Sequence, residues 1–305
     1  MVSPPALSVC IVSWNTRDLL DACLLSIEGA PDSTSREIIV VDNASADGSA
    51  EMVRKRHPEA RVIANEHNLG YAVGNNQAIE AASGELLLLL NPDIIVAGGA
   101  LDTLVGFLDG TPAAGAVAPR LVLTDGSTQA SCRSFPTPDV VLYEVLGLSR
   151  LFPRSRRFGK YRMTWWDYDD ERPVPQPMAS ALMIRREVVE QVGVMDERFP
   201  IFFNDVDLCK RIWEAGWEIW FTPRACLVHV GGASTSQVRK NMLVQSHRSF
   251  LRFYRKHYYG KLPWWQYWGA VALLRVGHAL RVFTHDVNSF LRGRSPAPAG
   301  NRTQM

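Results

Sequence analysis

The chain has 305 residues, 47% hydrophobic and 21% charged, which is enough to bury a large core and excludes a disordered or fibrous protein. Its formal net charge of +2 at pH 7 gives no general bias towards nucleic acid, and we expect no nucleic-acid partner. Five scattered cysteines without a Cys-x-x-Cys pair indicate reduced thiols. Residues 1–7 lack the pattern of a signal peptide, and no run of about 18 apolar residues predicts a membrane-spanning helix.

Short apolar segments alternate with helical periods through the first third of the chain. The predicted strands are residues 7–13, 38–41 and 61–64, and the predicted helices are residues 16–27, 50–56 and an Ala-rich stretch ending near residue 83. Strands separated by such helices form right-handed βαβ units and hence a parallel sheet. The composition therefore predicts one large α/β domain.

The segment 86–95, LLLLLNPDII, is the centre of this pattern. Five leucines in a row are typical of a strand that is buried on both faces of a parallel sheet. Pro92 cannot donate to a strand ladder, so the strand should end there and present Asn91 and Asp93 at its carboxyl end. Ligands of open α/β sheets bind at that edge, although an Asp in this position also commonly ends a strand or begins a turn.

Further polar residues follow the other predicted strands. Asp42 comes directly after a strand, where its carboxylate can accept from a bound base or ribose, or can equally form an Asx-turn. Asn68 and Asn76 add polar groups at the same edge, and Gly70 permits close approach of the backbone to a ligand or tight packing. The chain lacks both GxGxxG and GxxxxGK[ST], so the common phosphate-binding loops are excluded.

The second half of the chain carries further candidates. Predicted strands occupy residues 115–123, 178–184, 217–223 and 226–230, and predicted helices lie at residues 100–108 and within 136–149. Asp205 and Asp207 fall in the first turn of another helix, where the helix dipole stabilises negative charge, so a capping role is the alternative to a functional one. His229 ends the last strand, in a position where a lone histidine is usually structural.

The C-terminal part is basic and aromatic. From Arg239 to Arg294 there are eleven Lys and Arg residues and one acid, Asp286. Trp-rich residues 264–268 precede a helix in which Arg275, His278 and Arg281 would form one stripe. This pattern favours a helix that lies in a membrane interface, over the alternative of docking on the catalytic domain or on a second subunit. Residues 295–305 read as a disordered tail.

Four motifs in register resemble the inverting family 2 glycosyltransferases of GT-A fold, and within them the bacterial rhamnosyltransferase-like branch. These motifs are residues 12–15 (VSWN), 41–49 (VDNASADGS), 68–76 (NLGYAVGNN) and 90–93 (LNPD). The resemblance implies a mostly parallel α/β sheet flanked by helices, with a C-terminal helical extension. It also implies a nucleotide-sugar site formed by Ser13, Asn15, Asp42, Asn43, Asn68, Gly70, Asn76, Asn91 and Asp207.

The resemblance also assigns the chemical roles. Asp93 and His229 would hold a divalent metal, Mg²⁺ or Mn²⁺, on the donor diphosphate, which suits hard oxygen ligands and a neutral imidazole. Asp205 would be the catalytic base that takes the proton from the acceptor hydroxyl, with Asp207 as the fallback. Asn91 and Asn204 stand where family members commonly carry acids, which keeps open a weaker metal site or a non-catalytic sugar-nucleotide-binding subunit.

The implied reaction is the transfer of a sugar, first of all L-rhamnose from dTDP-L-rhamnose, to a hydroxyl of a lipid-linked or polysaccharide acceptor. A UDP-hexose or UDP-HexNAc transferase is the alternative. We expect residues 1–234 to form the transferase domain, residues 235–294 a membrane-associating segment and residues 295–305 the tail. The expected location is the cytoplasm, at the inner face of the cell membrane, and a homodimer is included among the expected assemblies.

Overall fold

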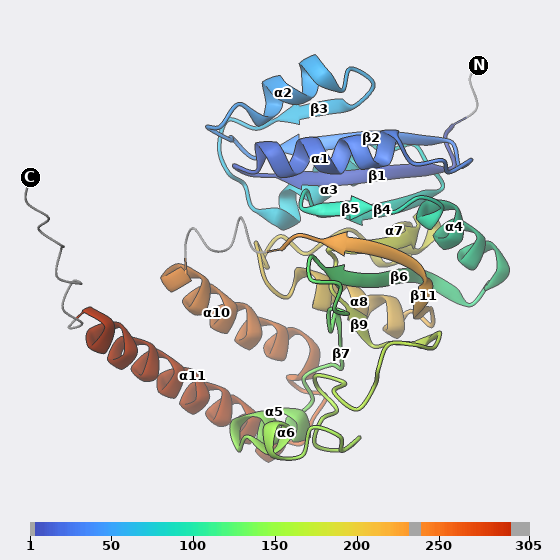
Figure 1. Ribbon diagram of the computed structural model, residues 1–305. Helices are drawn as coiled ribbons and strands as arrows, with labels where there is room; N and C mark the ends of the chain where they lie inside the picture. The colour runs from blue at the N-terminus through green and yellow to red at the C-terminus, as the bar shows by residue number, and fades with distance from the viewer. Residues whose placement is uncertain (1–3, 232–238, 294–305) are drawn as a thin grey trace, which may run out of the picture.

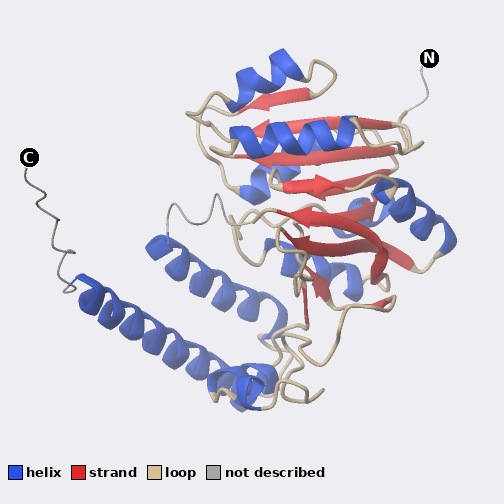
Figure 2. Cartoon of the chain, viewed as in Figure 1, coloured by secondary structure: helices blue, strands red, loops and turns tan. Residues whose placement is uncertain are grey.

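The computed structural model describes residues 4–231 and 239–293. Within these ranges one nine-stranded sheet forms the centre of the molecule, with the strand order β3-β2-β1-β4-β10-β6-β11-β5 and with β8 paired to β11 (Figures 1 and 2). The strands of this sheet are β1 Leu7–Ser13, β2 Arg36–Asp42, β3 Arg61–Ala64, β4 Leu86–Leu90, β5 Ile94–Val96, β6 Ala114–Leu123, β8 Arg172–Pro173, β10 Ala181–Arg185 and β11 Glu218–His229. A separate two-stranded sheet pairs β7 (Cys132–Arg133) with β9 (Gln176–Pro177).

Parallel pairing joins β3, β2, β1 and β4 in one half of the sheet, and β6 with β11 in the other. Strand β10 runs antiparallel between these halves. The pattern confirms the predicted mostly parallel α/β sheet. The sequence accounts for the central strand of this sheet. All five leucines of β4 are buried, because neighbouring strands lie on both sides of it and helices cover both faces.

The segment 86–95 is divided between two places in the sheet. Its leucines form the central strand β4, whereas Ile94 and Ile95 belong to β5, which pairs antiparallel with β11 at the far edge. Residues 91–93 are the crossing between these strands. Asp93 therefore lies between the end of β4 and the end of β11, where His229 is located.

Helices cover both faces of the sheet. The remaining elements are α1 Arg17–Glu28, α2 Ser49–Arg56, α3 Tyr71–Ala81, α4 Ala100–Gly110, α5 Pro138–Val145, α6 Leu148–Leu151, α7 Arg186–Val192, α8 Asn204–Glu214, α10 Arg239–Tyr258 and α11 Trp264–Gly293. One buried cluster joins the sheet to α1, α2 and α4, and a second joins it to α3, α7 and α8. Burial of these two apolar layers is the main stabilising contribution to the domain.

The C-terminal helices α10 and α11 form the predicted helical extension. Their aromatic residues pack with α5 and with the chain leading into α8, in a cluster that contains Phe199, Phe253, Tyr254 and Tyr267. The predicted domain boundary at residues 234/235 and the tail at 295–305 lie outside the described residues. Among the described helices, none is both long and apolar enough to span a bilayer.

Three further expectations can be compared with the structure. All five cysteines are free. The separate strands predicted at 217–223 and 226–230 are one strand, β11, with an irregularity between Thr222 and Cys226. Of the predicted stripe of basic residues on α11, Arg275 is exposed, and the partly buried His278 ring stacks on His247 of α10 at 4.0 Å between centroids. The side chain of Arg281 lies outside the described residues.

Candidate active site

A cavity of about 480 Å³ lies at the carboxyl ends of β1 and β4 and beside the first turn of α8. Its lining contains eight of the residues predicted for the site: Ser13, Asn43, Asn68, Gly70, Asn91, Asp93, Asp205 and His229. Residues separated by more than two hundred positions thus share one opening. This is the location where open α/β sheets bind their ligands.

The ends of β1 and β2 carry the first group of polar residues, of which Ser13 and Asn43 line the cavity and Asp42 does not. Ser13 and Asp42 are register partners in adjacent strands, and both are buried. Asp42 Oδ2 accepts from the Ser45 backbone N–H at 3.0 Å, so the turn predicted as the alternative role is present. Asp42 Oδ1, however, is buried without a hydrogen-bond partner in the described part of the chain. A buried carboxylate oxygen without a donor is costly, so it offers a place for an N–H or O–H of a bound molecule.

The loop before α3 shapes the neighbouring wall. Asn43 Nδ2 donates to the Gly70 carbonyl at 3.2 Å, and Asn68 Oδ1 accepts from the Gly70 N–H at 2.9 Å. Gly70 has φ of +90°, and a Cβ there would lie 3.0 Å from the Pro200 carbonyl oxygen. Only glycine fits this backbone without strain, which ties the loop at residue 70 to the segment that precedes α8.

Besides Asp207, three predicted donor residues do not line the cavity: Asp42, described above, and Asn15 and Asn76. Asn15 accepts from the Ala46 backbone N–H at 2.8 Å and so joins the two loops that follow β1 and β2. The amide of Asn76 is hydrogen-bonded to the backbone of Met195, through its oxygen and its nitrogen, at 2.9 Å each. Both side chains brace loops around the cavity, and the structure places neither on its surface.

Asp93 and His229 lie next to each other in the cavity wall. His229 Nε2 lies 3.3 Å from Asp93 Oδ1, but without the alignment of a hydrogen bond, so this oxygen is a buried acceptor with no hydrogen-bond partner among the described residues. His229 Nδ1 lies 2.8 Å from Gln129 Oε1. Because an amide oxygen can only accept, Nδ1 carries the proton. In the neutral ring the lone pair is then on Nε2, the nitrogen that lies near Asp93.

This donor set fits a divalent cation. An unpartnered carboxylate oxygen and an imidazole nitrogen converge, and a buried amide orients the imidazole, as is usual for histidines that bind metals. Among the described residues no group of three or more His, Cys, Asp or Glu side chains converges on one point. Any cation here would take its other ligands from a bound diphosphate and from water. Sequence reasoning missed Gln129, because no motif surrounds it and only the folded chain brings it to His229.

Asn91 follows β4 and is held by a residue that the sequence analysis did not select. Tyr71 Oη lies 2.9 Å from the Ala179 carbonyl and 3.2 Å from Asn91 Oδ1. The amide oxygen of Asn91 is therefore within reach of a hydroxyl donor. Burial, and then the negative charge of Asp205, raise the pKa of Tyr71 well above its ordinary value, so the phenol stays protonated. Tyr71 could have been selected from the sequence, because it lies within the motif at residues 68–76.

Asp205 lies in the first turn of α8 and is half-buried in the cavity wall. Burial raises the pKa of its carboxyl above the usual range, and the backbone N–H groups of Val206 and Ala179 offset only part of this effect. A carboxylate with a raised pKa is a better proton acceptor near neutral pH.

Asn204 is a structural residue beside Asp205. Its Nδ2 donates to the carbonyls of Phe199 and Ile201 at 3.2 and 3.1 Å, and its Oδ1 accepts from the Asp205 N–H at 2.7 Å. A carboxylate could accept but not donate here. The two donated hydrogen bonds therefore explain why asparagine stands here in place of the acid that is common in the family. Within this first turn of α8, Asp205 is the acid that faces the cavity.

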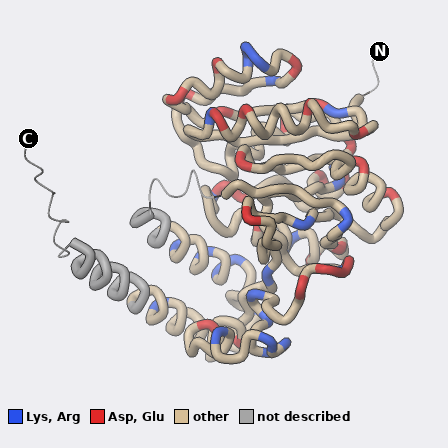
Figure 3. Tube along the Cα trace, viewed as in Figure 1, with Lys and Arg blue, Asp and Glu red and all other residues tan. Residues whose placement is uncertain are grey.

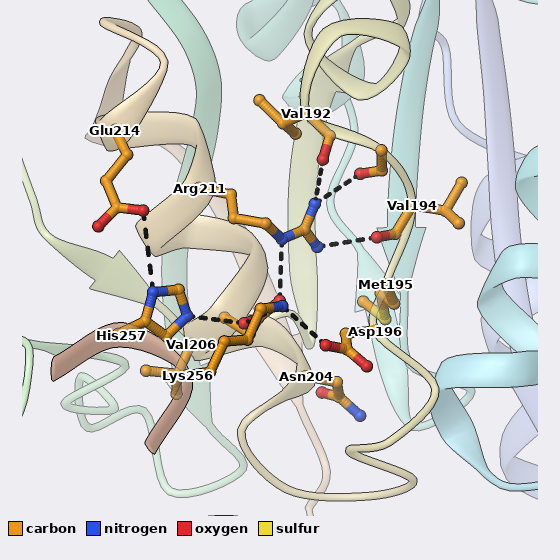
Figure 4. A network of polar contacts seen from close by, with 12 residues as sticks. Val192, Val194, Met195, Asp196, Asn204, Val206, Arg211, Glu214, Lys256 and His257 are labelled. Carbon is orange, nitrogen blue, oxygen red and sulfur yellow. Dashed lines mark hydrogen bonds and ion pairs between the residues drawn. The ribbon is translucent and has the colours of Figure 1, made fainter. Parts of the chain in front are cut away.

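Asp207 is not on the cavity surface, which corrects the expectation that it contacts the donor. It is fully buried on the opposite side of α8, within a charged network that reaches α10 (Figure 4). Lys256 Nζ and His257 Nε2 each lie 2.7 Å from Asp207 Oδ1, and Arg211 Nε lies 2.9 Å from Oδ2. Burial opposes ionisation, but the hydrogen bonds from His257 and Lys256 outweigh it and lower the pKa of Asp207.

The fold and the cavity define a class of protein, a nucleotide-sugar transferase of GT-A architecture, and comparison with known proteins agrees. Residues 8–193 match the family model described as Glycosyl transferase family 2, and the chain belongs to this family. The predicted GT-A fold is confirmed by a solved mannosyltransferase from Pyrobaculum calidifontis, in complex with GDP-Man and Mn²⁺. That chain superimposes with a TM-score of 0.58 at 19% identity, over 98% of this chain and 78% of the other.

Two relatives of known description add detail. The chain is 30% identical over 275 residues to the N-acetylglucosaminyl-diphospho-decaprenol L-rhamnosyltransferase of Mycobacterium tuberculosis, covering 85% of this chain and 86% of the relative. It is 26% identical over 209 residues to the low-salt glycan biosynthesis hexosyltransferase of Haloferax volcanii, covering 67% of this chain and 61% of the relative. The protein is thus a hexosyltransferase of glycosyltransferase family 2.

Proposed function

We propose that the protein transfers L-rhamnose from dTDP-L-rhamnose, with inversion at the anomeric carbon, to a hydroxyl of a lipid-linked acceptor. The observation that carries the choice of sugar and acceptor is the similarity to the mycobacterial rhamnosyltransferase, which extends over most of both chains. A polysaccharide hydroxyl is the other acceptor class that the same chemistry would serve.

The donor would bind with its base against the ends of β1 and β2. Asp42 Oδ1, buried and unpartnered among the described residues, would accept from a ring N–H of the pyrimidine. Ser13 and Asn43 would line the path of the ribose, and the loop of Asn68 and Gly70 would close beside it. These contacts fix the position of the sugar relative to α8, which lowers the entropic cost of the reaction.

Asp93 Oδ1 and His229 Nε2 would hold a divalent cation beside the diphosphate, with Gln129 fixing the imidazole. When bound, such a cation supplies positive charge to the departing diphosphate. Asp205 would accept the proton of the acceptor hydroxyl as its oxygen attacks C1 from the face opposite the diphosphate. The raised pKa of Asp205 supports this assignment.

A panel of sugar nucleotides tests the donor. Purified protein with Mn²⁺ would be assayed for hydrolysis and transfer with dTDP-L-rhamnose, UDP-glucose, UDP-N-acetylglucosamine and GDP-mannose. We expect turnover to be fastest with dTDP-L-rhamnose. A preference for a UDP-sugar would show that dTDP-L-rhamnose is not the donor, while the protein would still be a family 2 glycosyltransferase. Absence of turnover with every donor in the presence of acceptor would favour a non-catalytic sugar-nucleotide-binding subunit.

The location that we propose is the inner face of the cell membrane, where a lipid-linked acceptor would present its hydroxyl to the cavity. The similarity to an enzyme whose name includes a decaprenol-linked compound supports a membrane-bound acceptor. The attachment that we propose there is peripheral.

A further inference from the structure

Helix α11 carries apolar residues on both of its sides, together with one exposed cation, Arg275, on the outer side. Its inner side, with Tyr267, Ala270, Val271 and Leu274, is buried against α5 and α10. Its outer side carries Trp264, Trp265 and Trp268, which are 76%, 60% and 52% exposed, followed by exposed Ala272 and Val276. A helix on the surface of a water-soluble domain normally turns polar residues outward. Three exposed tryptophans on one face therefore indicate that something other than water covers it.

A second exposed apolar group lies on the chain that follows α5. Helix α5 packs on the inner side of α11, where a Cβ on Gly277 would lie 3.4 Å from Val145, and α5 and α6 lie near the end of α11 that carries the tryptophans (Figure 1). The chain that leaves α5 exposes Leu146, and the end of α6 exposes Leu151 and Phe152, at 68% and 47%. These side chains belong to a part of the chain more than a hundred residues earlier in the sequence than α11.

The same segment is strongly basic. Residues 145–166 contain six Lys and Arg residues and no acid, in a protein whose formal net charge is only +2. Figure 3 shows basic residues gathered around α5, α6 and the loop that follows them. Arg150 and Arg154, on either side of Leu151 and Phe152, are exposed and form no ion pair in the described structure. Exposed cations next to exposed apolar and aromatic side chains are the chemistry of a surface that binds anionic lipid.

Two basic residues of α10 are engaged within the protein. Lys256 pairs with Asp196 and Asp207 at 2.7 Å each, and His257 is buried against Asp207. The charge that the sequence analysis assigned to the C-terminal segment is thus partly used to hold α10 on α8. Exposed positive charge in this region comes from Arg275 of α11 itself and from the basic residues among 150–157.

We propose that the outer face of α11 and residues 146–157 together form one docking surface for an anionic lipid bilayer. This inference deepens the membrane location given under the proposed function and rests on it only for the presence of a membrane acceptor. The tryptophans, Leu151 and Phe152 would enter the interface between headgroups and acyl chains, while Arg150 and Arg154 contact lipid phosphates. A second copy of the chain is the less suitable occupant, because a two-fold contact through this surface would bring the same cations together.

Vesicle binding by the full-length protein tests the proposal without any assay of catalysis. Sedimentation would use vesicles of phosphatidylcholine alone and of phosphatidylcholine mixed with phosphatidylglycerol. We expect much stronger binding to the mixed vesicles. Because one cation near an anionic surface changes partitioning about fivefold, Arg150→Gln with Arg154→Gln should weaken binding by about tenfold or more.

Two further variants separate the parts of the surface. Leu151→Ser with Phe152→Ser, and Trp264→Ser with Trp265→Ser and Trp268→Ser, should each reduce binding to the mixed vesicles. All five residues are exposed, so the fold should be unaffected. The matched control is Arg54→Gln with Lys55→Gln, which removes two exposed cations from α2 at the opposite end of the molecule (Figure 1) and should bind like the wild type.

Three outcomes would overturn the proposal. They are absence of wild-type binding to mixed vesicles, unchanged binding of the Leu151 and Phe152 variant, and an equal loss in the α2 control, which would indicate net charge alone. A wild-type dimer that the tryptophan variant converts to a monomer would assign the surface to a second copy. Failure of the proposed sugar transfer would leave vesicle binding unaffected, so the two proposals fail separately.

Discussion

Lys256 Nζ lies 2.7 Å from Asp207 Oδ1, and this ion pair ties helix α10 to helix α8 two residues beyond Asp205. The contact is supported by Phe203, the residue before α8, which has φ of +68° and packs against Phe250 and Phe253 of α10. The C-terminal extension thus supports the turn that presents the proposed base. Helix α10 is thus packed directly against the part of the GT-A domain that carries Asp205.

Replacement of Asp207 with Asn should destabilise the fold by about 3 kcal/mol, because it leaves Lys256, His257 and Arg211 without their buried counter-charge. Urea unfolding at neutral pH measures the change. Asp18→Asn is the control, since Asp18 is almost fully exposed and its contact with Arg17 is 3.8 Å long, so its loss should cost less than about 0.5 kcal/mol. Equal effects of the two variants would contradict the structural role of Asp207.

The pH dependence of the free energy of unfolding provides a second test of the role of Asp207. Its pKa is lower in the folded protein than in the unfolded chain, so its contribution is fully present above the unfolded value of about 3.9. That contribution is lost as the pH falls through the lower folded value. The difference in stability between wild type and Asp207→Asn should therefore be constant near neutrality and shrink only in acid.

Asp205 should set the acidic limb of the rate profile. A base must be ionised, and burial raises its pKa, so kcat should begin to fall at a pH above the ordinary Asp value of about 3.9. Asp205→Asn should lower kcat by about a hundredfold or more. Asp205→Glu, which keeps a carboxylate, should retain part of the activity and move the limb. If kcat of Asp205→Glu falls at the same pH as kcat of the wild type, Asp205 is not the base.

Gln129 should control metal affinity through His229. Gln129→Leu removes the oxygen that accepts from His229 Nδ1, and loss of such a contact typically lowers metal affinity by about tenfold or more. Calorimetric titration of dTDP in the presence of Mn²⁺ measures this without turnover. Asp93→Ala should reduce dTDP binding to the level found with a chelator.

Gln191→Leu is the control for that titration, because Gln191 accepts only from Trp217 at 2.7 Å among the described residues, away from the cavity. Its dTDP binding should match the wild type. Metal-dependent binding that survives intact in Asp93→Ala would remove Asp93 from the metal site.

A pair of glycine substitutions should have effects of opposite sign. Gly70→Ala should destabilise the protein by about 1–3 kcal/mol, because its φ is +90° and a Cβ would lie 3.0 Å from the Pro200 oxygen. Gly106→Ala, in the middle of α4 with no atom within 4 Å of the new Cβ, should stabilise it by about 0.5–1 kcal/mol. Thermal unfolding of both variants provides the comparison, and a neutral Gly70→Ala would show that the loop adapts.

Much of the fold was predictable because its signals are local. The strand at residues 7–13 and the strand at 61–64 were predicted at their observed bounds, since apolar runs between turn residues reflect burial directly. The position of Ile94 and Ile95 was not predictable in the same way. An apolar pair after Asn-Pro-Asp reads as part of the same strand, and only pairing with β11 places it at the far edge of the sheet.

The sequence by itself determined that this protein is an α/β domain of glycosyltransferase family 2, because buried strands, turn residues and motif order are properties of neighbouring residues. Only the tertiary structure decided which acid lines the cavity and which is buried in a network of ion pairs. Asp205 and Asp207 are two positions apart, yet one faces the cavity and the other a lysine and a histidine about fifty residues later. Gln129 and His229 likewise meet across 100 residues. Periodicity reports how a side chain is oriented on its own element, whereas the partner it meets depends on how distant elements pack.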